Sequence, residues 1–265
     1  HKVTVFNRSA GRAEAWVRKH GGASAKTPKE AAAGARFVFM CVGNDDDVRS
    51  VSYGTDGALA GLGQGAILVD HTTASADVAR ELDKAARAAG RAFLDAPVSG
   101  GQAGAEKGQL TVMVGGESAN FELAQPVIAA YAKSCTLLGP AGAGQLTKMV
   151  NQISIAGLVQ GLSEALAFGL KAGLDMEKVV DVISKGAAQS WQMDNRAKTM
   201  IAGKFDFGFA LDWMRKDLGI CLAEAKRNGA QLPVTALVDQ FYARRQARGG
   251  GRTDTSSLIE LLTKP

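Results

Sequence analysis

The sequence predicts an α/β domain at residues 1–142, followed by an all-α domain at residues 143–265. Two observations support this division. As far as Lys133, short apolar segments alternate with amphipathic ones, which is the pattern of a parallel sheet covered by helices. Beyond the glycine-rich stretch 139–144, almost every segment has helical periodicity. A chain of 265 residues is long enough for two domains of ordinary size.

The elements of the first domain follow from this periodicity. Apolar segments predict strands at 2–6, 36–43, 66–70, 91–95 and 110–115. Amphipathic segments predict helices at 9–21, 75–90 and 117–133. In the second of these helices Val78 and Leu82 repeat at helical spacing, and Gly90 suits its C-terminal end. The second domain is expected to open with one very long helix, from about Gln145 to Ala172, before several shorter ones.

The charge balance limits the kinds of partner. The net charge is +5 and the isoelectric point is about 9.1, which fits a protein that handles small acidic molecules. Nucleic acid is not expected, because basic residues are spread along the chain and aromatic residues make up only 6% of it. The one basic cluster, at 243–252, is interpreted as a solvated helix end and loop.

The cysteines and the apolar segments indicate the compartment. Three cysteines, without a CxxC motif or a metal-like grouping with the three histidines, predict no disulfide framework, no metal and a cytoplasmic location. No signal peptide is visible. The longest apolar stretch, 153–174, is interrupted by polar residues that include Glu164 and Lys171, so no membrane span is expected.

The first predicted strand, "KVTVF", is followed at once by "NRS". In a dinucleotide-binding unit, a first strand and a glycine-rich loop precede the second strand, whose end holds the ribose. If 2–6 is that second strand, the first strand and the loop are missing, and no GxGxxG occurs in the sequence. The interpretation is a Rossmann-type domain truncated by about 25 residues at its N-terminus.

The residues Asn7, Arg8 and Ser9 are candidates for binding the cofactor. A carboxylate at this position would accept a hydrogen bond from a free ribose 2′-hydroxyl, whereas these residues offer donors and a positive charge. They therefore favour NADP, with NAD as the alternative. A polar turn in which Ser9 caps the next helix is the simpler interpretation, and the βαβ context makes the cofactor interpretation the stronger one.

The loop "DAPVSGG" places the Ser99 hydroxyl beside Gly100 and Gly101. Small residues allow close approach of an anion, and backbone amides can converge on its oxygens. The alternative is a glycine-rich connector between two strands, and these residues alone leave both interpretations open.

The segment "GAGQLTKMVNQ" places Lys148 within the first turns of the long helix. Asn151 and Gln152 lie three and four residues further on, so the three side chains share a helix face. A lysine flanked by apolar residues at a domain junction is partly desolvated, and such a lysine can exchange a proton with a hydroxyl or carbonyl group. In "RKDLG", by contrast, sequence alone favours a surface ion pair between Lys216 and Asp217.

These three motifs, in this order and at these separations, resemble the β-hydroxyacid dehydrogenase family across the whole chain. The family is related to 6-phosphogluconate dehydrogenase, and its members include 3-hydroxyisobutyrate dehydrogenases, tartronate semialdehyde reductases and glyoxylate/succinic semialdehyde reductases. The resemblance implies an active site in a cleft between the domains. It also implies hydride transfer between NADP(H) and a small 3-hydroxy acid or its semialdehyde.

The resemblance assigns a role to each candidate residue. Lys148 becomes the catalytic general acid/base, and Asn151, with Gln152 beside it, becomes the amide that positions the substrate. Lys216 changes from a surface charge to a residue near the nicotinamide. The loop residues implied to bind the substrate carboxylate are Ser99, Gly100 and Gly101, and those implied to contact the cofactor are Val42, Gly43 and Thr73.

Some features depart from the family pattern. The missing glycine loop implies weak cofactor binding by the chain as given, and "CVGN" stands where many relatives have Leu-Pro. His71 follows a strand near the expected cofactor position, where a bystander role is favoured over titration.

Two alternatives to the dehydrogenase remain. One is an imine reductase on the same scaffold, although such relatives generally lack the lysine and the carboxylate loop. The other is a non-catalytic oligomerisation module. The long apolar helix predicts a homodimer or homotetramer that associates through the helical domain.

Overall fold

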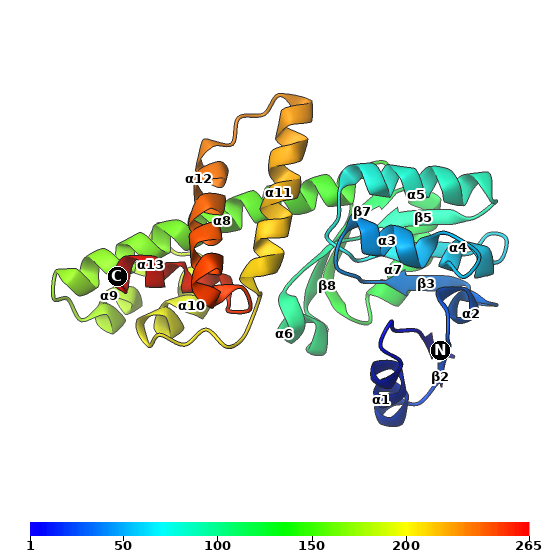
Figure 1. Ribbon diagram of the computed structural model, residues 1–265, viewed down its shortest axis with the longest axis horizontal. Helices are drawn as coiled ribbons and strands as arrows, with labels where there is room; N and C mark the ends of the chain where they lie inside the picture. The colour runs from blue at the N-terminus through cyan, green and yellow to red at the C-terminus, as the bar shows by residue number, and fades with distance from the viewer. Residues whose placement is uncertain (265) are drawn as a thin grey trace. The chain divides into compact units, whose positions relative to one another are not determined.

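The computed structural model describes residues 1–264, which form two compact units, His1–Lys148 and a second that begins at Met149 (Figure 1). The division falls inside helix α8 (Ala143–Lys171) rather than at the predicted 142/143 junction. The helix is continuous, so no loop separates the two units.

The main sheet of the first unit is mixed. Strands β3 (Phe37–Met40), β4 (Ile67–Asp70) and β5 (Ala92–Asp95) are parallel neighbours in that order. Strand β7 (Leu110–Gly116) then pairs antiparallel with β5, so the expectation of a purely parallel sheet is wrong for this strand. The chain between β5 and β7 forms only β6 (Val98–Ser99), which is antiparallel to β7, and the short helix α6 (Gly101–Glu106). That connection holds no crossover helix of the length that a parallel return requires.

The end of the first unit also differs from the sequence prediction. Helix α7 (Ser118–Ile128) stops before Lys133, and Ala132–Leu137 forms strand β8, parallel to β7. The segment "AKSCTL" is half-buried at Ala132, Cys135 and Leu137 and pairs along most of β7, so sheet pairing overrides the helical pattern that precedes it.

The N-terminal strands β1 (Thr4–Val5) and β2 (Ala23–Ser24) form a separate two-stranded parallel sheet. The predicted helix between them is confirmed as α1 (Ala10–His20), which ends at Gly21 with φ of 79°. The short helix α2 (Pro28–Ala32) follows, and the Thr27 side chain caps its start.

The core of the first unit lies on both faces of the main sheet. Leu68 and Phe93 point to one face, where α3 (Asp45–Ser52), α4 (Ala58–Gly61) and α5 (Ala76–Ala88) pack. Val69 and Leu94 point to the other face, which α7 covers. In the parallel register Met40 lies opposite Asp70, and Asp70 lies opposite Asp95. The loops that follow β3, β4 and β5 therefore leave the sheet at the same edge.

The second unit is helical, as predicted. The remainder of α8 packs with the helices α9 (Met176–Ile183), α10 (Trp191–Ile201), α11 (Leu211–Asn228), α12 (Pro233–Arg245) and α13 (Glu260–Thr263) and with two short irregular helices, 246–250 and 255–259. Its fully buried centre includes Val159 of α8, Met214 of α11 and Tyr242 of α12.

Helix α8 is long and apolar enough to cross a membrane by length and composition, and it is the one helix among the described residues that passes this test. A single such helix is weak evidence, because the core helix of a soluble protein passes too. Here it carries Gln145 and Gln152, which are buried and hydrogen-bonded within their own units.

Candidate active site

Three predicted binding loops meet at one edge of the main sheet. Val42 and Gly43 follow β3, Thr73 follows β4 and Ser99 follows β5, all beyond the carboxyl ends of parallel strands. Ligands of open α/β sheets bind outside this edge. The fold therefore brings the predicted cofactor and carboxylate loops to the edge at which binding is expected.

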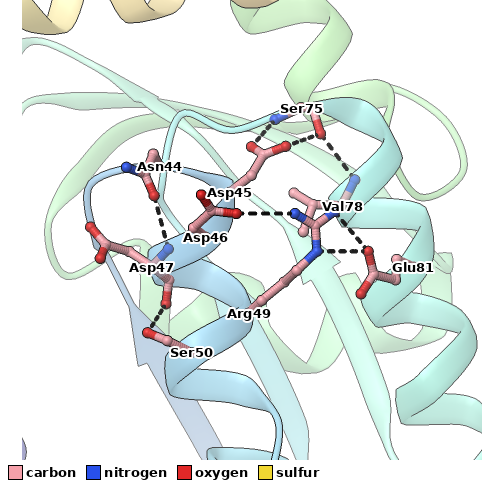
Figure 2. Close-up of polar contacts among 9 residues, drawn as sticks. All are labelled: Asn44, Asp45, Asp46, Asp47, Arg49, Ser50, Ser75, Val78 and Glu81. Atoms are coloured by element: carbon pink, nitrogen blue, oxygen red, sulfur yellow. Dashed lines mark hydrogen bonds and ion pairs between the residues drawn. The ribbon is translucent and has the colours of Figure 1, made fainter.

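The loops after β3 and β4 are joined by hydrogen bonds. The Val42 backbone N–H donates to the Thr72 hydroxyl at 2.9 Å, which joins the two loops. Within the loop after β3, the Gly43 N–H donates to the Asp47 carboxylate at 3.2 Å. Figure 2 shows a second link at the start of α3, where the Asp45 carboxylate accepts from the Ser75 N–H at 2.8 Å and from the Ser75 hydroxyl at 2.5 Å. These contacts hold both loops in one geometry.

The same region is tied together along its helices. Arg49 on α3 donates to Glu81 on α5, with a shortest distance of 2.9 Å, and Asn44 caps α3 by accepting from the Asp47 N–H at 2.8 Å (Figure 2). Because α3 and α5 each begin directly after a binding loop, fixing one helix to the other limits movement of those loops.

Arg8 lies three residues beyond the end of β1 with its side chain 87% exposed, and its guanidinium meets Asp47 at 3.2 Å. Asn7 accepts from the Ser9 N–H at 2.9 Å. Ser9 stands at the start of α1, but its side chain makes no capping hydrogen bond. The arginine therefore offers most of its donors to solvent, close to the loop after β3.

These residues fit two parts of a dinucleotide. An exposed guanidinium suits a ribose phosphate, and the loops at the sheet edge suit the nicotinamide end. A GxGxxG cradle for the pyrophosphate does not occur in the 265 residues. Among the residues present, Arg8 and Asn7 would hold the ribose end, and Val42, Gly43 and Thr73 would line the other.

The Ser99 loop depends on its glycines. Ser99 ends β6 opposite Thr111 of β7, and it is followed by Gly100 and Gly101 with φ of 127° and 61°. L-residues with side chains rarely adopt such values. At Gly100 a Cβ would also lie 3.2 Å from the Leu110 side chain. The half-buried hydroxyl is thus presented on a backbone that other residues would strain.

Asp95 connects this loop to the helix that carries Lys148. Its side chain is fully buried and accepts from the Gly142 N–H at 2.7 Å and from the Gln145 N–H at 2.9 Å. A carboxylate at a helix N-terminus satisfies N–H groups that lack partners within the helix. The close approach requires Gly144, where a Cβ would lie 2.4 Å from the Met113 carbonyl oxygen.

Gln145 makes the second connection of this helix. Its side-chain amide donates to the Thr72 carbonyl at 2.7 Å and accepts from the Ala74 N–H at 3.0 Å. Lys148, less than one turn further along α8, is only 7% exposed. The predicted general acid/base is therefore buried on a helix whose start is tied to the loop after β4 and to Asp95 at the end of β5.

Two titratable groups stand at the end of strand β4: Asp70, which is buried and ends the strand, and His71, which follows it and is half-buried. Burial raises the pKa of Asp70 to about 7, against the opposing effect of hydrogen bonds from Thr72 and with the help of the Asp95 charge. Burial lowers the pKa of His71. The His71 ring bonds the Ala96 carbonyl through Nδ1 at 2.6 Å, so Nδ1 carries the proton and Nε2 accepts from the Tyr131 hydroxyl at 2.8 Å.

The remaining predicted residues form a chain within the second unit. Asn151 donates to the Gln152 carbonyl oxygen at 2.8 Å, and Gln152 donates to Asp217 at 2.6 Å. Asp217 also meets Lys216 at 3.1 Å. Its side chain is 1% exposed, so the sequence-only interpretation of a surface ion pair is wrong. A buried carboxylate here orients both Gln152 and Lys216.

Sequence reasoning missed three residues that fix the candidate ones in place, Thr72, Asp95 and Gln145, and it placed a fourth, Asp217, in a surface ion pair. Each stands within four residues of a predicted site residue. Asp95 and Gln145 fall inside the quoted motifs, but their partners lie 47 to 73 positions away along the chain. Only the packed structure shows those contacts.

Comparison with known proteins identifies the family. A profile described as the NAD binding domain of 6-phosphogluconate dehydrogenase matches residues 1–139, and one described as NAD-binding of NADP-dependent 3-hydroxyisobutyrate dehydrogenase matches residues 142–262. The chain belongs to the β-hydroxyacid dehydrogenase family. It is accordingly an NAD(P)-dependent oxidoreductase that acts on a CH–OH group.

Individual relatives match along most of the chain. An uncharacterized oxidoreductase of Shewanella frigidimarina (strain NCIMB 400) is 64% identical over 264 residues, covering all of this chain and 91% of the relative. A 2-hydroxy-3-oxopropionate reductase of Escherichia coli (strain K12) is 34% identical, covering 91% of this chain and 83% of the relative. The solved 3-hydroxyisobutyrate dehydrogenase of Mycobacterium tuberculosis with L-serine has a TM-score of 0.89 at 30% identity, covering 99% of this chain and 91% of that one.

Proposed function

We propose that this β-hydroxyacid dehydrogenase uses NADP to interconvert a small 3-hydroxy acid and its semialdehyde, with Lys148 as the general acid/base. The observation that carries the proposal is the burial of Lys148 near a helix start that is fixed to the loop after β4 and to Asp95 at the end of β5. A buried amine held in one place is suited to proton transfer at a substrate oxygen.

In the reducing direction each residue has a separate role. When bound, a nicotinamide cofactor would supply the hydride that the carbonyl carbon receives. The ammonium group of Lys148 gives a proton to the carbonyl oxygen as negative charge develops there. The Ser99 hydroxyl, with the backbone at Gly100 and Gly101, holds the substrate carboxylate, which fixes the orientation of the carbonyl group. Asn151 and Gln152 position the substrate from the next turn of α8.

One assay tests both the substrate class and the catalytic role of Lys148. Oxidation of NADPH is followed at 340 nm with glyoxylate, succinic semialdehyde, tartronate semialdehyde and methylmalonate semialdehyde. Lys148→Ala is expected to lower kcat at least ~100-fold without loss of NADPH binding, as is typical of a general acid/base. Lys171→Ala, at the exposed end of the same helix, is the matched control and should keep full activity.

Other outcomes of this assay support the alternatives. Full activity of Lys148→Ala would contradict the role of the lysine. Reduction of a cyclic imine, without turnover of any of the four aldehydes, would favour an imine reductase. No turnover by folded oligomers would favour a non-catalytic module.

The cofactor preference has its own test. Arg8 exposes its guanidinium and has Asp47 as its ion-pair partner, so the arginine can turn towards a 2′-phosphate. Arg8→Ala is expected to raise the Kd of NADPH at least ~10-fold, the size of one charge-assisted contact, and to leave that of NADH almost unchanged. The control is Arg18→Ala, on the exposed last turn of α1. An equal loss for both cofactors would overturn the NADP proposal.

The proposed partner is a second copy of the chain, in a homodimer or homotetramer. Helix α8 leaves Val150, Leu158 and Phe168 exposed, by 64%, 46% and 75%. A large apolar surface on one helix is typical of an interface between subunits. Light scattering coupled to size exclusion should give a multiple of the 27.6 kDa chain, and Phe168→Asp should shift it towards the monomer. A monomeric wild-type protein would overturn this proposal.

A further inference from the structure

The NH₂ group and the carbonyl oxygen of the Gln145 side chain both bond residues outside helix α8. The residue is 1% exposed. Its NH₂ group donates to the Thr72 carbonyl at 2.7 Å, and its carbonyl oxygen accepts from the Ala74 N–H at 3.0 Å. The two contacts fall on either side of Thr73, so a single side chain fixes the backbone before and after the predicted cofactor residue.

The loop that Gln145 holds is joined in turn to the loop after β3. Thr72 accepts from the Val42 N–H through its hydroxyl at 2.9 Å and binds Gln145 through its carbonyl oxygen. A continuous path of hydrogen bonds therefore runs from Val42 through Thr72 to Gln145. Lys148 is three residues further along α8, which places it beside Gln145 on the helix surface.

We propose that Gln145 is the positioning residue that sets the place of Lys148 relative to the two cofactor loops. This inference rests on the proposed role of Lys148. Asp95 already satisfies the N–H groups of Gly142 and Gln145 at the helix start. The side chain of Gln145 is therefore not needed to begin the helix, and its contacts serve the alignment of the helix with the loop.

Kinetics of the full chain test the proposal first. Gln145→Leu removes both contacts at similar volume, and it is expected to lower kcat by roughly 10- to 100-fold, as a small displacement of a reacting group does. The KM for succinic semialdehyde should change less than about threefold, because the Ser99 loop is untouched. Gln160→Leu, which removes a surface glutamine of the same helix bonded to Glu164, should leave both constants unchanged.

A conservative variant separates positioning from packing. In Gln145→Glu a protonated carboxyl group keeps one donor and one acceptor, whereas the carboxylate cannot donate to Thr72. The ionisable groups on the elements around position 145 are Asp70, Asp95, Lys148 and Arg80, and Arg80 lies beside Gly142 at the start of α8. The ratio of kcat of Gln145→Glu to kcat of Gln145→Leu should rise as the pH falls, because protonation of the introduced carboxyl group restores the donor to Thr72. The other ionisable groups affect both variants alike, so their effect cancels in the ratio.

A third measurement does not depend on activity. Hydrogen exchange of the Ala74 amide in the cofactor-free protein should become at least ~10-fold faster in Gln145→Leu, because that N–H loses its acceptor. Unchanged exchange would overturn the contact on which the inference depends.

The outcomes distinguish the two proposals. If Lys148→Ala keeps its activity, or if the wild-type protein turns over none of the four aldehydes, the proposed function fails and the inference fails with it. If Lys148→Ala is inactive but Gln145→Leu keeps its kcat, only the inference fails. A loss that affects kcat and KM in proportion, without rescue of Gln145→Glu at low pH, would assign Gln145 to packing and overturn the inference.

Discussion

The buried carboxylates of the two units have different kinds of partner. In the second unit Asp254 meets Arg196, and Asp217 meets Lys216, both at 3.1 Å. In the first unit Asp70 and Asp95 have no cation within ion-pair distance among residues 1–264, and they accept from backbone N–H groups instead.

This difference matches what the carboxylates hold together. Asp254, just before the short helix 255–259, meets Arg196 of α10. Asp217 meets its neighbour Lys216 on α11 and accepts from Gln152 of α8, so both paired carboxylates also join two elements. The unpaired ones hold loops and a helix start, where only backbone donors are available. Because a buried carboxylate without a cation remains poorly stabilised, the pKa of Asp70 rises to about 7. The cofactor side of the molecule is therefore the one expected to respond to pH.

The largest effect is expected where an ion pair is broken. Asp254→Ala leaves the half-buried Arg196 without its carboxylate and removes the acceptor of the Phe209 and Ser256 N–H groups. The free energy of unfolding should fall by about 3–5 kcal/mol, measured by urea titration. Asp181→Ala removes the exposed pair with Lys198 and should cost less than about 1 kcal/mol. Equal losses would remove the distinction between buried and exposed pairs.

A smaller loss is expected from the unpaired carboxylate of Asp95. Asp95→Asn keeps one acceptor oxygen but turns an NH₂ group towards a backbone N–H of α8. The cost should be about 1–3 kcal/mol, the penalty of an unsatisfied buried donor. Differential scanning calorimetry provides the measurement, with Asp77→Asn on the surface of α5 as the control. If Asp95→Asn is as stable as the control, the carboxylate does not hold the helix start.

The smallest effect is a dependence on pH. The pKa of Asp70 is raised from 3.8 to about 7 in the folded protein, so between these values the folded state binds more protons than the unfolded state. The contribution of Asp70 to stability is therefore present at low pH and is lost as the pH rises through 7. Asp70→Asn cannot ionise, so its Tm relative to the wild type should rise between pH 5 and pH 8.

The size of this change should be about 1 kcal/mol, below the full value of the pKa shift, because the surroundings of a buried charge relax. Asp77→Asn should show a constant difference in Tm from the wild type over the same range. A constant difference for Asp70→Asn as well would show that Asp70 does not titrate in this range.

Particular residues show how far sequence reasoning reached. The helix predicted from the spacing of Val78 and Leu82 is confirmed as α5. It could be predicted because an amphipathic pattern depends only on residues close together in the sequence. The family was identified from short motifs around Ser99, Lys148 and Lys216, and the profile matches confirm it. Strand β8 was missed because a six-residue segment becomes a strand only when β7 lies beside it.

The sequence by itself determined the division into an α/β and a helical part, the family, and the positions of Ser99 and Lys148, since periodicity and motifs are properties of neighbouring residues. The tertiary structure decided the direction of β7, the burial of Asp217 and the contacts of Asp95 and Gln145 with distant loops. Those features depend on which segments pack together, and burial then determines which polar groups must find a partner.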